Sequence, residues 1–338
     1  RGIIWDMSRV QFVHTYQYII SLENLLEAWK EFAIGKRSRK DVQEFEFNLM
    51  NNIISLHNDL AAKIYRHSPY QAFNVFDPKL RRIHKACVKD RVLHHAIFRI
   101  LYPIFDPAFI SDSYSCRIKK GTHRAINRLQ KFARKVNKNN TQDCFILKCD
   151  IKKFFDSIDH DNLISLIEKK VKDKNAIWLI EEIVKSFSTS PNKSLPLGNI
   201  TSQLFANIYL NELDQLVKHK LKIKYYIRYC DDFIILNDNN EYLEKLIPII
   251  NNFLKEKLKL FLHSGKIEIR KYHQGIDFLG YVSFPHHRLL RAKTKRRMFN
   301  KIEQRIEELK EKKISEEFFN QTIQSYLGIL KHCNSYKL

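Results

Sequence analysis

Two adjacent acidic residues, Asp231 and Asp232, carry the strongest chemical signal in this sequence. They stand between the apolar runs Tyr225–Tyr229 and Phe233–Leu236, which predict a β-hairpin with the acidic pair in the middle of its turn. Neighbouring carboxylates repel each other and stay ionised only when cations lie close to them. Mg²⁺ suits such a pair, because it binds a few carboxylate oxygens and completes its octahedron with water and phosphate oxygens. An ordinary hairpin turn is the alternative, since Asp favours turns.

A third carboxylate, Asp150, follows the short apolar run Cys144–Cys149, which predicts a buried strand that ends at Asp150. Ligands collect at strand ends, because side chains there leave the core and keep a rigid support. If Asp150 converges with the acidic pair, the three carboxylates form a site for two Mg²⁺ ions, with Mn²⁺ as a substitute. Such a site joins nucleotides, because one ion lowers the pKa of a primer 3′-hydroxyl and the other neutralises a triphosphate.

Basic and aromatic residues elsewhere are candidates for holding the nucleoside triphosphate. A predicted basic hairpin would let Lys79 and Arg81 steady the leaving pyrophosphate, although a solvated basic turn explains them equally well. Phe155 would floor the sugar pocket and exclude a 2′-hydroxyl, or else serve as a core aromatic. Gln203, near the start of a predicted helix, can hydrogen-bond a base or a sugar. The predicted triphosphate-binding set is Lys79, Arg81, Ile151, Phe155 and Gln203.

Composition points to a polyanionic partner. The 338 residues include 59 Lys and Arg against 37 Asp and Glu, a net charge of +22, and 44% of residues are hydrophobic, which indicates a folded chain. A basic surface gains affinity for nucleic acid by releasing phosphate counterions. A membrane partner is not expected, because no apolar run approaches ~20 residues and no signal peptide opens the chain. The six cysteines lack zinc-type spacing and predict reduced, mostly buried thiols in a cytoplasmic protein.

One predicted helix, which begins near Lys119, concentrates this charge. Its apolar positions face the core, and its opposite side carries a basic stripe that suits a nucleic-acid backbone. A merely solvated helix face is the alternative. The stripe comprises Arg124, Arg128, Lys131, Arg134 and Lys135.

The remaining pattern mixes helices and strands. Helices are expected over about 160–171, 175–187 and 241–256, and the two runs Lys266–Arg270 and Ile276–Val282 predict strands that pair as a hairpin. From Leu289 the chain is basic and helical, with Lys295 and Arg296 near its head. The pattern predicts an α+β protein of closely packed parts.

Taken in order along the chain, these motifs resemble the palm of reverse transcriptases. The resemblance rests on Tyr229–Asp232, on Asp150 and Phe155 upstream, and on Phe278–Tyr281 downstream. It implies a right-hand polymerase fold: N-terminal helices and helical and β fingers over 1–145, an antiparallel palm of the split βαβ type over 146–288, and a helical thumb over 289–338. It also implies that Lys266 protonates the pyrophosphate. The implied nucleic-acid contacts are Arg124, Arg128, Lys131, Phe278, Leu279, Gly280, Lys295 and Arg296.

Within that group the chain is most similar to the reverse transcriptases of diversity-generating retroelements of bacteria and phages. The likeness rests on Ser113–Arg117, Lys120–Arg124, Leu197–Gly198, Ser202–Gln203 and the end of the chain after Gly328. It implies an enzyme that copies a template RNA into cDNA with errors at adenines, aided by a small, basic, oligomeric accessory protein. Relatives encoded by group II introns usually continue into further domains.

Two other interpretations stay open. Reverse transcriptases of bacterial antiphage defence have similar palms and work with a dedicated noncoding RNA. A basic RNA-binding scaffold with an inactive palm is less favoured, because Asp150, Asp231 and Asp232 are all present. Two departures from the pattern of the relatives are expected to matter: Cys230 occupies a position that varies among them, and the stretch up to Leu338 is expected to be short for a thumb.

Overall fold

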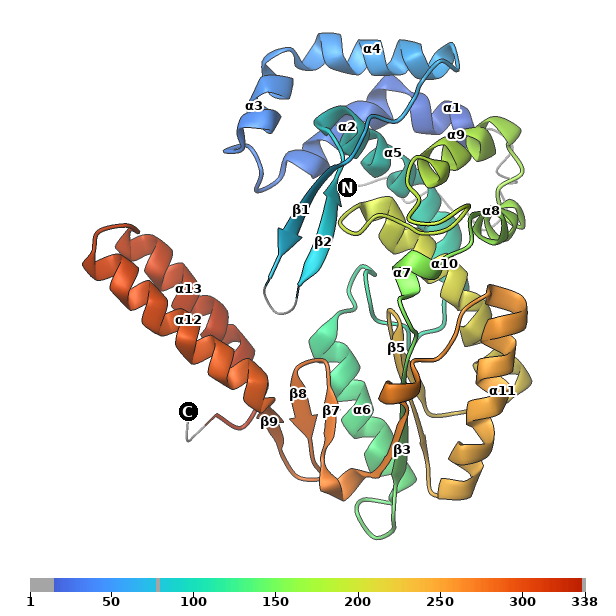
Figure 1. Ribbon diagram of the computed structural model, residues 1–338, viewed down its shortest axis with the longest axis vertical. Helices are drawn as coiled ribbons and strands as arrows, with labels where there is room; N and C mark the ends of the chain where they lie inside the picture. Colours follow the sequence, from blue (N-terminus) through green and yellow to red (C-terminus); the bar gives the residue numbers. More distant parts are fainter. Residues whose placement is uncertain (1–14, 77–79, 336–338) are drawn as a thin grey trace, which may run out of the picture. The chain divides into compact units, whose positions relative to one another are not determined.

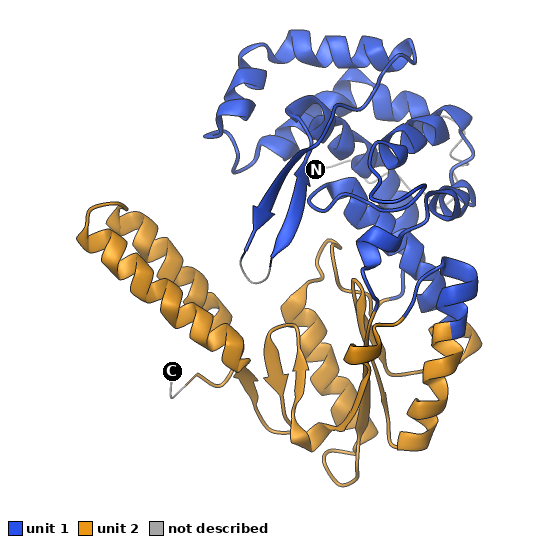
Figure 2. Ribbon diagram, in the orientation of Figure 1, with its two compact units in different colours: residues 1–110, 151–216, 252–261 blue, residues 111–150, 217–251, 262–338 orange. Residues whose placement is uncertain are grey.

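The computed structural model describes residues 15–76 and 80–335 and divides the chain into two compact units. Unit 1 comprises residues 1–110, 151–216 and 252–261, and unit 2 comprises residues 111–150, 217–251 and 262–338 (Figure 2). Asp150 and Ile151 therefore belong to different units although they are neighbours in the sequence.

Unit 1 is mainly helical, and the long helix α5 (Val88–Phe105) packs against α1, α2, α3 and α10 (Figure 1). Its core is apolar because helical periodicity places one stripe of each helix inward, so that Trp29, Phe32 and Leu93 are almost fully buried. The other helices of this unit are α1 (Thr15–Ile20), α2 (Leu22–Ala33), α3 (Lys40–Phe47), α4 (Leu49–Ala61), α7 (Phe154–Ser157), α8 (His160–Glu168), α9 (Lys174–Lys185) and α10 (Ile200–Gln215).

A hairpin of two strands extends from unit 1. Strand β1 (Gln71–Val75) pairs antiparallel with β2 (Arg81–Lys85), and Arg81 lies opposite Val75. This is the predicted basic hairpin, and its second strand begins at the predicted Arg81. The predicted Lys79 lies outside the described residues.

Unit 2 is built on a four-stranded sheet with the strand order β4-β5-β3-β6. The strands are β3 (Phe145–Asp150), β4 (Tyr226–Tyr229), β5 (Asp232–Asn237) and β6 (Glu268–Lys271). Because β5 runs antiparallel to both of its neighbours, β3 and β4 are parallel to each other and separated by one strand. This is the split βαβ arrangement, so the predicted α+β class with an antiparallel sheet of this type is confirmed.

The helix α6 (Thr122–Val136) and a second sheet share a hydrophobic core with the four-stranded sheet. That second sheet consists of β7 (Ile276–Phe278), β8 (Tyr281–Ser283) and β9 (Arg288–Leu290) in sequence order. The prediction that Lys266–Arg270 pairs with Ile276–Val282 was therefore wrong. Strand β6 instead pairs with β3, and residues 276–283 form a hairpin of their own.

Two long helices complete unit 2. They are α12 (Ala292–Lys310) and α13 (Glu316–Leu330), which pack against each other. Ser315 caps the N-terminus of α13, because its hydroxyl accepts a hydrogen bond from the backbone N–H of Phe318. The helix α11 (Asn240–Leu258) is divided between the two units.

Two further expectations concerned the burial of the cysteines and the absence of a membrane-spanning helix. Only Cys144 and Cys149 are buried among the six free cysteines, so the prediction of mostly buried thiols was wrong. No helix within residues 15–76 and 80–335 combines the length and the apolar composition that crossing a membrane requires.

Candidate active site

Asp150 and Asp232 face each other across the ladder between β3 and β5. Asp150 is the last residue of β3 and Asp232 the first residue of β5, and the antiparallel register pairs them directly. Side chains of directly opposed residues share one face of a sheet, with Cβ atoms about 4.5–5.5 Å apart. Strand pairing thus brings together two residues that are 82 positions apart in the sequence, which meets the condition that the sequence set for Asp150.

Asp231 lies in the turn that joins β4 to β5. Tyr229 pairs with Asp232, so the two residues between the strands are Cys230 and Asp231. The prediction that Asp231 and Asp232 form the middle of the turn was therefore off by one residue. Cys230 has a φ of +57°, a left-handed backbone conformation that costs conformational energy for any residue with a Cβ atom. The fully buried Arg228 donates a hydrogen bond from Nη1 to the carbonyl of Cys230 at 3.2 Å and so supports this turn.

Asp150, Asp231 and Asp232 together form a group that we call the carboxylate cluster. Their charges interact strongly. Burial raises the pKa of Asp231 above its usual value, and the charge of Asp150 adds to that effect. Burial together with the charges of Asp231 and Asp150 raises the pKa of Asp232 to about 7. The cluster therefore disfavours its own full ionisation, which is the electrostatic situation that a nearby cation relieves.

One cation already lies at the cluster. Lys266, at the end of a short 3₁₀ turn (Ser264–Lys266), donates a hydrogen bond from Nζ to Oδ2 of Asp150 at 2.8 Å. This bond raises the pKa of Lys266. The backbone N–H of His263 also donates to the carbonyl of Asp150 at 2.8 Å, which ties the turn to the end of β3. The predicted Lys266 is thus brought to the predicted Asp150.

The donor set of the cluster fits a hard divalent cation, because it consists of half-buried or buried carboxylates at the adjoining ends of β3 and β5. Within the described ranges 15–76 and 80–335, no three His, Cys, Asp or Glu side chains already stand in the arrangement of a bound metal ion. Metal binding at Asp150, Asp231 and Asp232 is accordingly a proposal that depends on their chemistry and on the raised pKa values of Asp231 and Asp232.

The predicted triphosphate-binding residues that the structure describes belong to unit 1. Arg81 is exposed on β2, Phe155 is half-buried in α7 with its ring against Phe154, and Ile151 is buried at 1% exposure. Their roles stay predictions. Gln203 is exposed in the first turn of α10.

Gln203 lines a basic hollow of about 330 Å³ within unit 1. Its wall includes the cations Lys36, Arg39, Lys85 and Arg91. The hollow also contains Asn199, which is only 4% exposed and whose Nδ2 donates to no other described group. A buried amide without an acceptor is costly, so this wall is suited to a ligand that supplies one, such as a phosphate oxygen or a base carbonyl.

The basic stripe on α6 is only partly free. Arg124 and Lys131 are exposed and line a hollow of about 320 Å³ together with Lys120 and Arg128. Arg128, however, donates from Nε at 2.8 Å and from Nη2 at 3.3 Å to the buried carboxylate of Asp112. We therefore interpret Lys131 as an exposed cation that is available to a phosphate, and Arg124 as an exposed cation whose Nη1 donates to the main-chain carbonyl of Lys119. Arg128 is bound within the fold.

The predicted primer-contacting motif forms the turn of the hairpin β7–β8. Phe278 is only 1% exposed and belongs to the hydrophobic core, so the expectation of a direct contact by its side chain was wrong. Strand alternation explains this, since every second residue of β7 points inward. Leu279 and Gly280 make the two-residue turn with φ values of +52° and +90°. Farther on, Lys295 is half-buried and Arg296 is exposed on α12.

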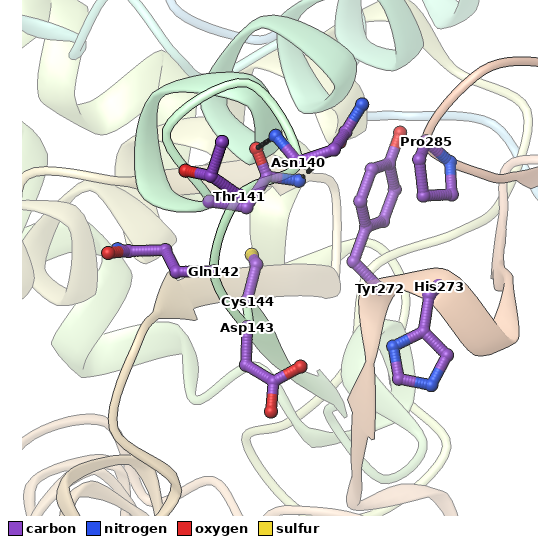
Figure 3. Close-up of a pocket in the computed structure, with 9 residues that line it drawn as sticks. Asn140, Thr141, Gln142, Asp143, Cys144, Tyr272, His273 and Pro285 are labelled. Atoms are coloured by element: carbon purple, nitrogen blue, oxygen red, sulfur yellow. Dashed lines mark hydrogen bonds between the residues drawn. The ribbon is translucent and has the colours of Figure 1, made fainter.

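A second hollow of unit 2 lies at the opposite end of β3. It measures about 400 Å³, and Figure 3 shows polar side chains such as Asn140, Asp143 and His273 around it. Five residue steps of β3 separate Phe145, which follows the lining residue Cys144, from Asp150, and this amounts to about 17 Å. The ion pair of Asp143 with Lys271 at 2.7 Å occupies part of its wall. This hollow is therefore separate from the carboxylate cluster.

Two cations on the strands of the cluster were missed by the sequence interpretation. Lys148 lies two residues before Asp150, on the same face of β3, and Arg228 lies three residues before Asp231. The sequence did contain an indication of their importance, because each is a charged residue inside a run that was predicted to be a buried strand. A buried or half-buried cation needs an acceptor, and both have one near the site.

Comparisons with known proteins agree with this geometry. Residues 76–283, more than half of the chain, match the family described as reverse transcriptase (RNA-dependent DNA polymerase). Protein YkfC of Escherichia coli is 23% identical over 271 residues, which cover 68% of this chain and 69% of that protein. The group II intron-encoded protein LtrA of Lactococcus lactis is 26% identical over 271 residues, which cover 60% of this chain but only 44% of LtrA.

Among solved structures, an apo telomerase from Candida tropicalis, truncated from its C-terminal domain, has a TM-score of 0.49 and 14% identity over 69% of this chain and 58% of that one.

Proposed function

The chain belongs to the reverse transcriptase family, the RNA-dependent DNA polymerases, and on that premise we propose that it copies an RNA template into DNA at the carboxylate cluster. The observation that supports the site best is the pairing of Asp150 with Asp232, with Asp231 in the adjoining turn. Three acidic side chains at the adjoining ends of two paired strands are suited to nucleotidyl transfer, because that reaction requires charge neutralisation more than covalent chemistry from the protein.

The chemistry divides between metal ions and side chains. Two Mg²⁺ ions held by Asp150, Asp231 and Asp232, or Mn²⁺ in their place, would lower the pKa of a primer 3′-hydroxyl and neutralise the triphosphate. Lys266 would then donate a proton from Nζ to the leaving pyrophosphate, for which its position beside Asp150 and its protonated state are suited.

Deoxynucleotide binding is proposed for the residues of unit 1. Arg81 would contact the triphosphate, with Lys79 as a second predicted cation, and Ile151 and Gln203 would contribute to the pocket. Phe155 would stack beneath the sugar and reject a 2′-hydroxyl, which favours deoxynucleotides. The half-buried position of Phe155 supports this proposal, because a ring that is fully buried could not meet a ligand.

Template and product would follow the basic surfaces. The exposed cations Arg124 and Lys131 on α6 are suited to phosphates, and Lys295 and Arg296 on α12 are suited to a second stretch of backbone. The turn Leu279–Gly280 would contact the primer end. In this scheme residues 1–145 are N-terminal helices and fingers, 146–288 the palm and 289–338 the thumb.

A more specific proposal is that the enzyme serves a diversity-generating retroelement. The supporting residues are Ser113–Arg117, Lys120–Arg124, Leu197–Gly198 and Ser202–Gln203, which resemble that group. The proposal includes a dedicated template RNA, error-prone synthesis at adenines, a small basic accessory protein and a cytoplasmic location in a bacterium. Antiphage defence with a noncoding RNA is the competing role.

Two measurements test these proposals. Purified protein should extend a DNA primer on an RNA template when Mg²⁺ and deoxynucleotides are present, and absence of labelled product from folded protein would contradict the polymerase assignment. Sequencing of the RNA and cDNA that copurify with the protein then decides the role. Adenine-directed mismatches in the cDNA would support diversification, and faithful copies of a structured noncoding RNA would support defence.

A further inference from the structure

Lys148 connects the strand that ends at Asp150 to the hairpin β7–β8. Its Nζ donates a hydrogen bond to the main-chain carbonyl of Asp277 at 2.7 Å. Lys148 and Asp150 alternate with Cys149 along β3, so they share one face of the sheet. That face also carries Ile146, which belongs to the core that contains Ile276 and Phe278 of β7.

The register of the hairpin explains why this carbonyl is available. Phe278 and Tyr281 flank the two-residue turn, and such a closing pair exchanges both of its backbone hydrogen bonds. The next pair, Asp277 with Val282, is then a pair that exchanges none. The carbonyl of Asp277 therefore points away from β8, on the open edge of a sheet whose order begins with β7. Lys148 supplies the donor that this edge lacks.

The same residue is held from its other side. Arg291, which precedes α12, donates from Nε to Oδ1 of Asp277 at 2.7 Å, and its Nη2 contacts the same oxygen. The backbone N–H of Arg291 also donates to the carbonyl of Gly280 at 3.0 Å. The hairpin is thus fixed at its strand by Lys148 and at its turn by Arg291.

We propose that Lys148 is a positioning residue for nucleotide addition, which sets the turn Leu279–Gly280 at a defined place relative to the carboxylate cluster. The inference rests on the proposed polymerase function, in which that turn contacts the primer end. In-line attack by a 3′-hydroxyl requires accurate placement, and a misplacement of about 1 Å can lower a rate by about a hundredfold. A charged side chain that bridges the catalytic strand and the primer-contacting hairpin meets that requirement.

A purely electrostatic role is the competing explanation. Lys148 lies diagonally from Asp232 across the β3–β5 ladder, and its charge acts on that carboxylate. Arg291 separates the two explanations, because it holds Asp277 and Gly280 and, among the described residues, forms no hydrogen bond or ion pair with the carboxylates of the cluster. Its loss should disturb the hairpin and leave the charge next to Asp232 in place.

The experiment compares Lys148→Met, Lys148→Arg, Arg291→Gln and the double variant Lys148→Met with Arg291→Gln. Lys293→Met serves as the matched control, because Lys293 is an exposed cation of the same helix start as Arg291. Single-turnover addition of one deoxynucleotide gives the rate constant and the apparent deoxynucleotide affinity. Hydrogen exchange of the amides of residues 276–283 and of β3 and β5 reports local opening without requiring activity.

Lys148→Met should lower the rate constant about ten- to a hundredfold and change the deoxynucleotide affinity by less than about threefold. Lys148→Arg should retain most of the rate, and Arg291→Gln should lose about as much rate as Lys148→Met. The loss in the double variant should be smaller than the product of the two single losses, because both side chains act through Asp277. In Lys148→Met and Arg291→Gln the amides of 276–283 should exchange faster while β3 and β5 stay protected. Lys293→Met should match the wild type.

Two results would overturn the proposal. One is normal exchange of residues 276–283 in Lys148→Met. The other is a slow Lys148→Met beside an Arg291→Gln of wild-type rate, which would assign Lys148 to the electrostatics of the cluster. A wild-type protein that adds no nucleotide would instead contradict the proposed function, and the exchange data would still decide whether Lys148 fixes the hairpin.

Discussion

Lys266 holds its ammonium nitrogen 2.8 Å from Oδ2 of Asp150, at the edge of the sheet where Asp150 pairs with Asp232. A metal ion bound at that oxygen would compete with this bond. Lys266 would therefore offset part of the charge of the cluster and, with a cation held by Asp150, Asp231 and Asp232, would be available as the proton donor to the substrate.

Proton donation by Lys266 is testable by substitution. Lys266→Gln should lower the single-turnover rate of extension by about 10²-fold or more, the usual contribution of general acid catalysis. Lys266→Arg should be almost as slow, because a guanidinium keeps the charge but does not give up its proton. Full activity of the arginine variant would show that charge alone is needed. Lys293→Gln, which removes an exposed cation of α12 that has no proposed role, provides the control.

The raised pKa of Asp232 predicts how stability depends on pH. Asp232 keeps its proton up to about pH 7 in the folded protein, whereas its ordinary pKa is 3.8. Between these values the folded chain binds more protons than the unfolded chain, so stability should fall as pH rises through that window. Mg²⁺ should restore stability mainly near and above the upper end of the window, because it binds the ionised carboxylates.

Thermal unfolding midpoints measured across this window, with Mg²⁺ and with a chelator, check this expectation. Asp232→Asn carries no titrating carboxyl and should show a flatter pH dependence and a smaller Mg²⁺ effect than the wild type. An equal Mg²⁺ effect in both proteins would place the cation elsewhere.

Phe155 should control the choice of sugar. Phe155→Val removes the ring and should raise ribonucleotide incorporation relative to deoxynucleotide incorporation by at least about tenfold, since a lost steric block is worth more than about 1.4 kcal/mol. Competing incorporation of the two nucleotides on one template measures the ratio. The adjoining Phe154 is 2% exposed, so its replacement should cost stability instead of selectivity. An unchanged ratio in Phe155→Val would reject the gate.

Arg124 and Arg128 should behave differently although both lie on the basic stripe. Arg124→Gln should weaken RNA binding and reduce the dependence of log affinity on log salt by about one, as expected for one lost phosphate contact. Arg128→Gln leaves the buried Asp112 without this cationic partner, although the hydroxyl of Tyr114 still donates to it, and should cost about 1–3 kcal/mol of stability. Filter binding over a range of salt concentrations and chemical denaturation measure the two effects. A normal salt slope in Arg124→Gln would exclude that residue from the RNA path.

The sequence pattern predicted the elements that bring Asp150 and Asp232 together, because apolar strands and an acidic tip are local features. It placed the turn one residue late, since Cys230 gives no composition signal for the left-handed conformation that the turn requires. It also predicted Phe278 as a contact residue, whereas strand alternation turns this ring into the core.

Other features depend on partners distant in sequence and could not be predicted. The sequence predicts Arg128 as part of a solvent-facing basic stripe, and its ion pair with Asp112 becomes evident only in the folded structure. In the sequence Lys148 only interrupts an apolar run. Its role as a hydrogen-bond donor to the carbonyl of Asp277 depends on the register of β7–β8, which the sequence does not reveal. Such roles follow from tertiary packing, which overrides the local pattern.

The central claim is that Asp150, Asp231 and Asp232 act as one metal-dependent site for DNA synthesis. It is tested most directly by primer extension on an RNA template with Asp231→Asn, measured beside RNA binding by the same protein. The account predicts that extension falls below detection while RNA affinity and its salt dependence stay at the wild-type level, because the substitution removes a carboxylate and leaves the basic surfaces intact. Extension by Asp231→Asn at a rate close to that of the wild type would contradict it.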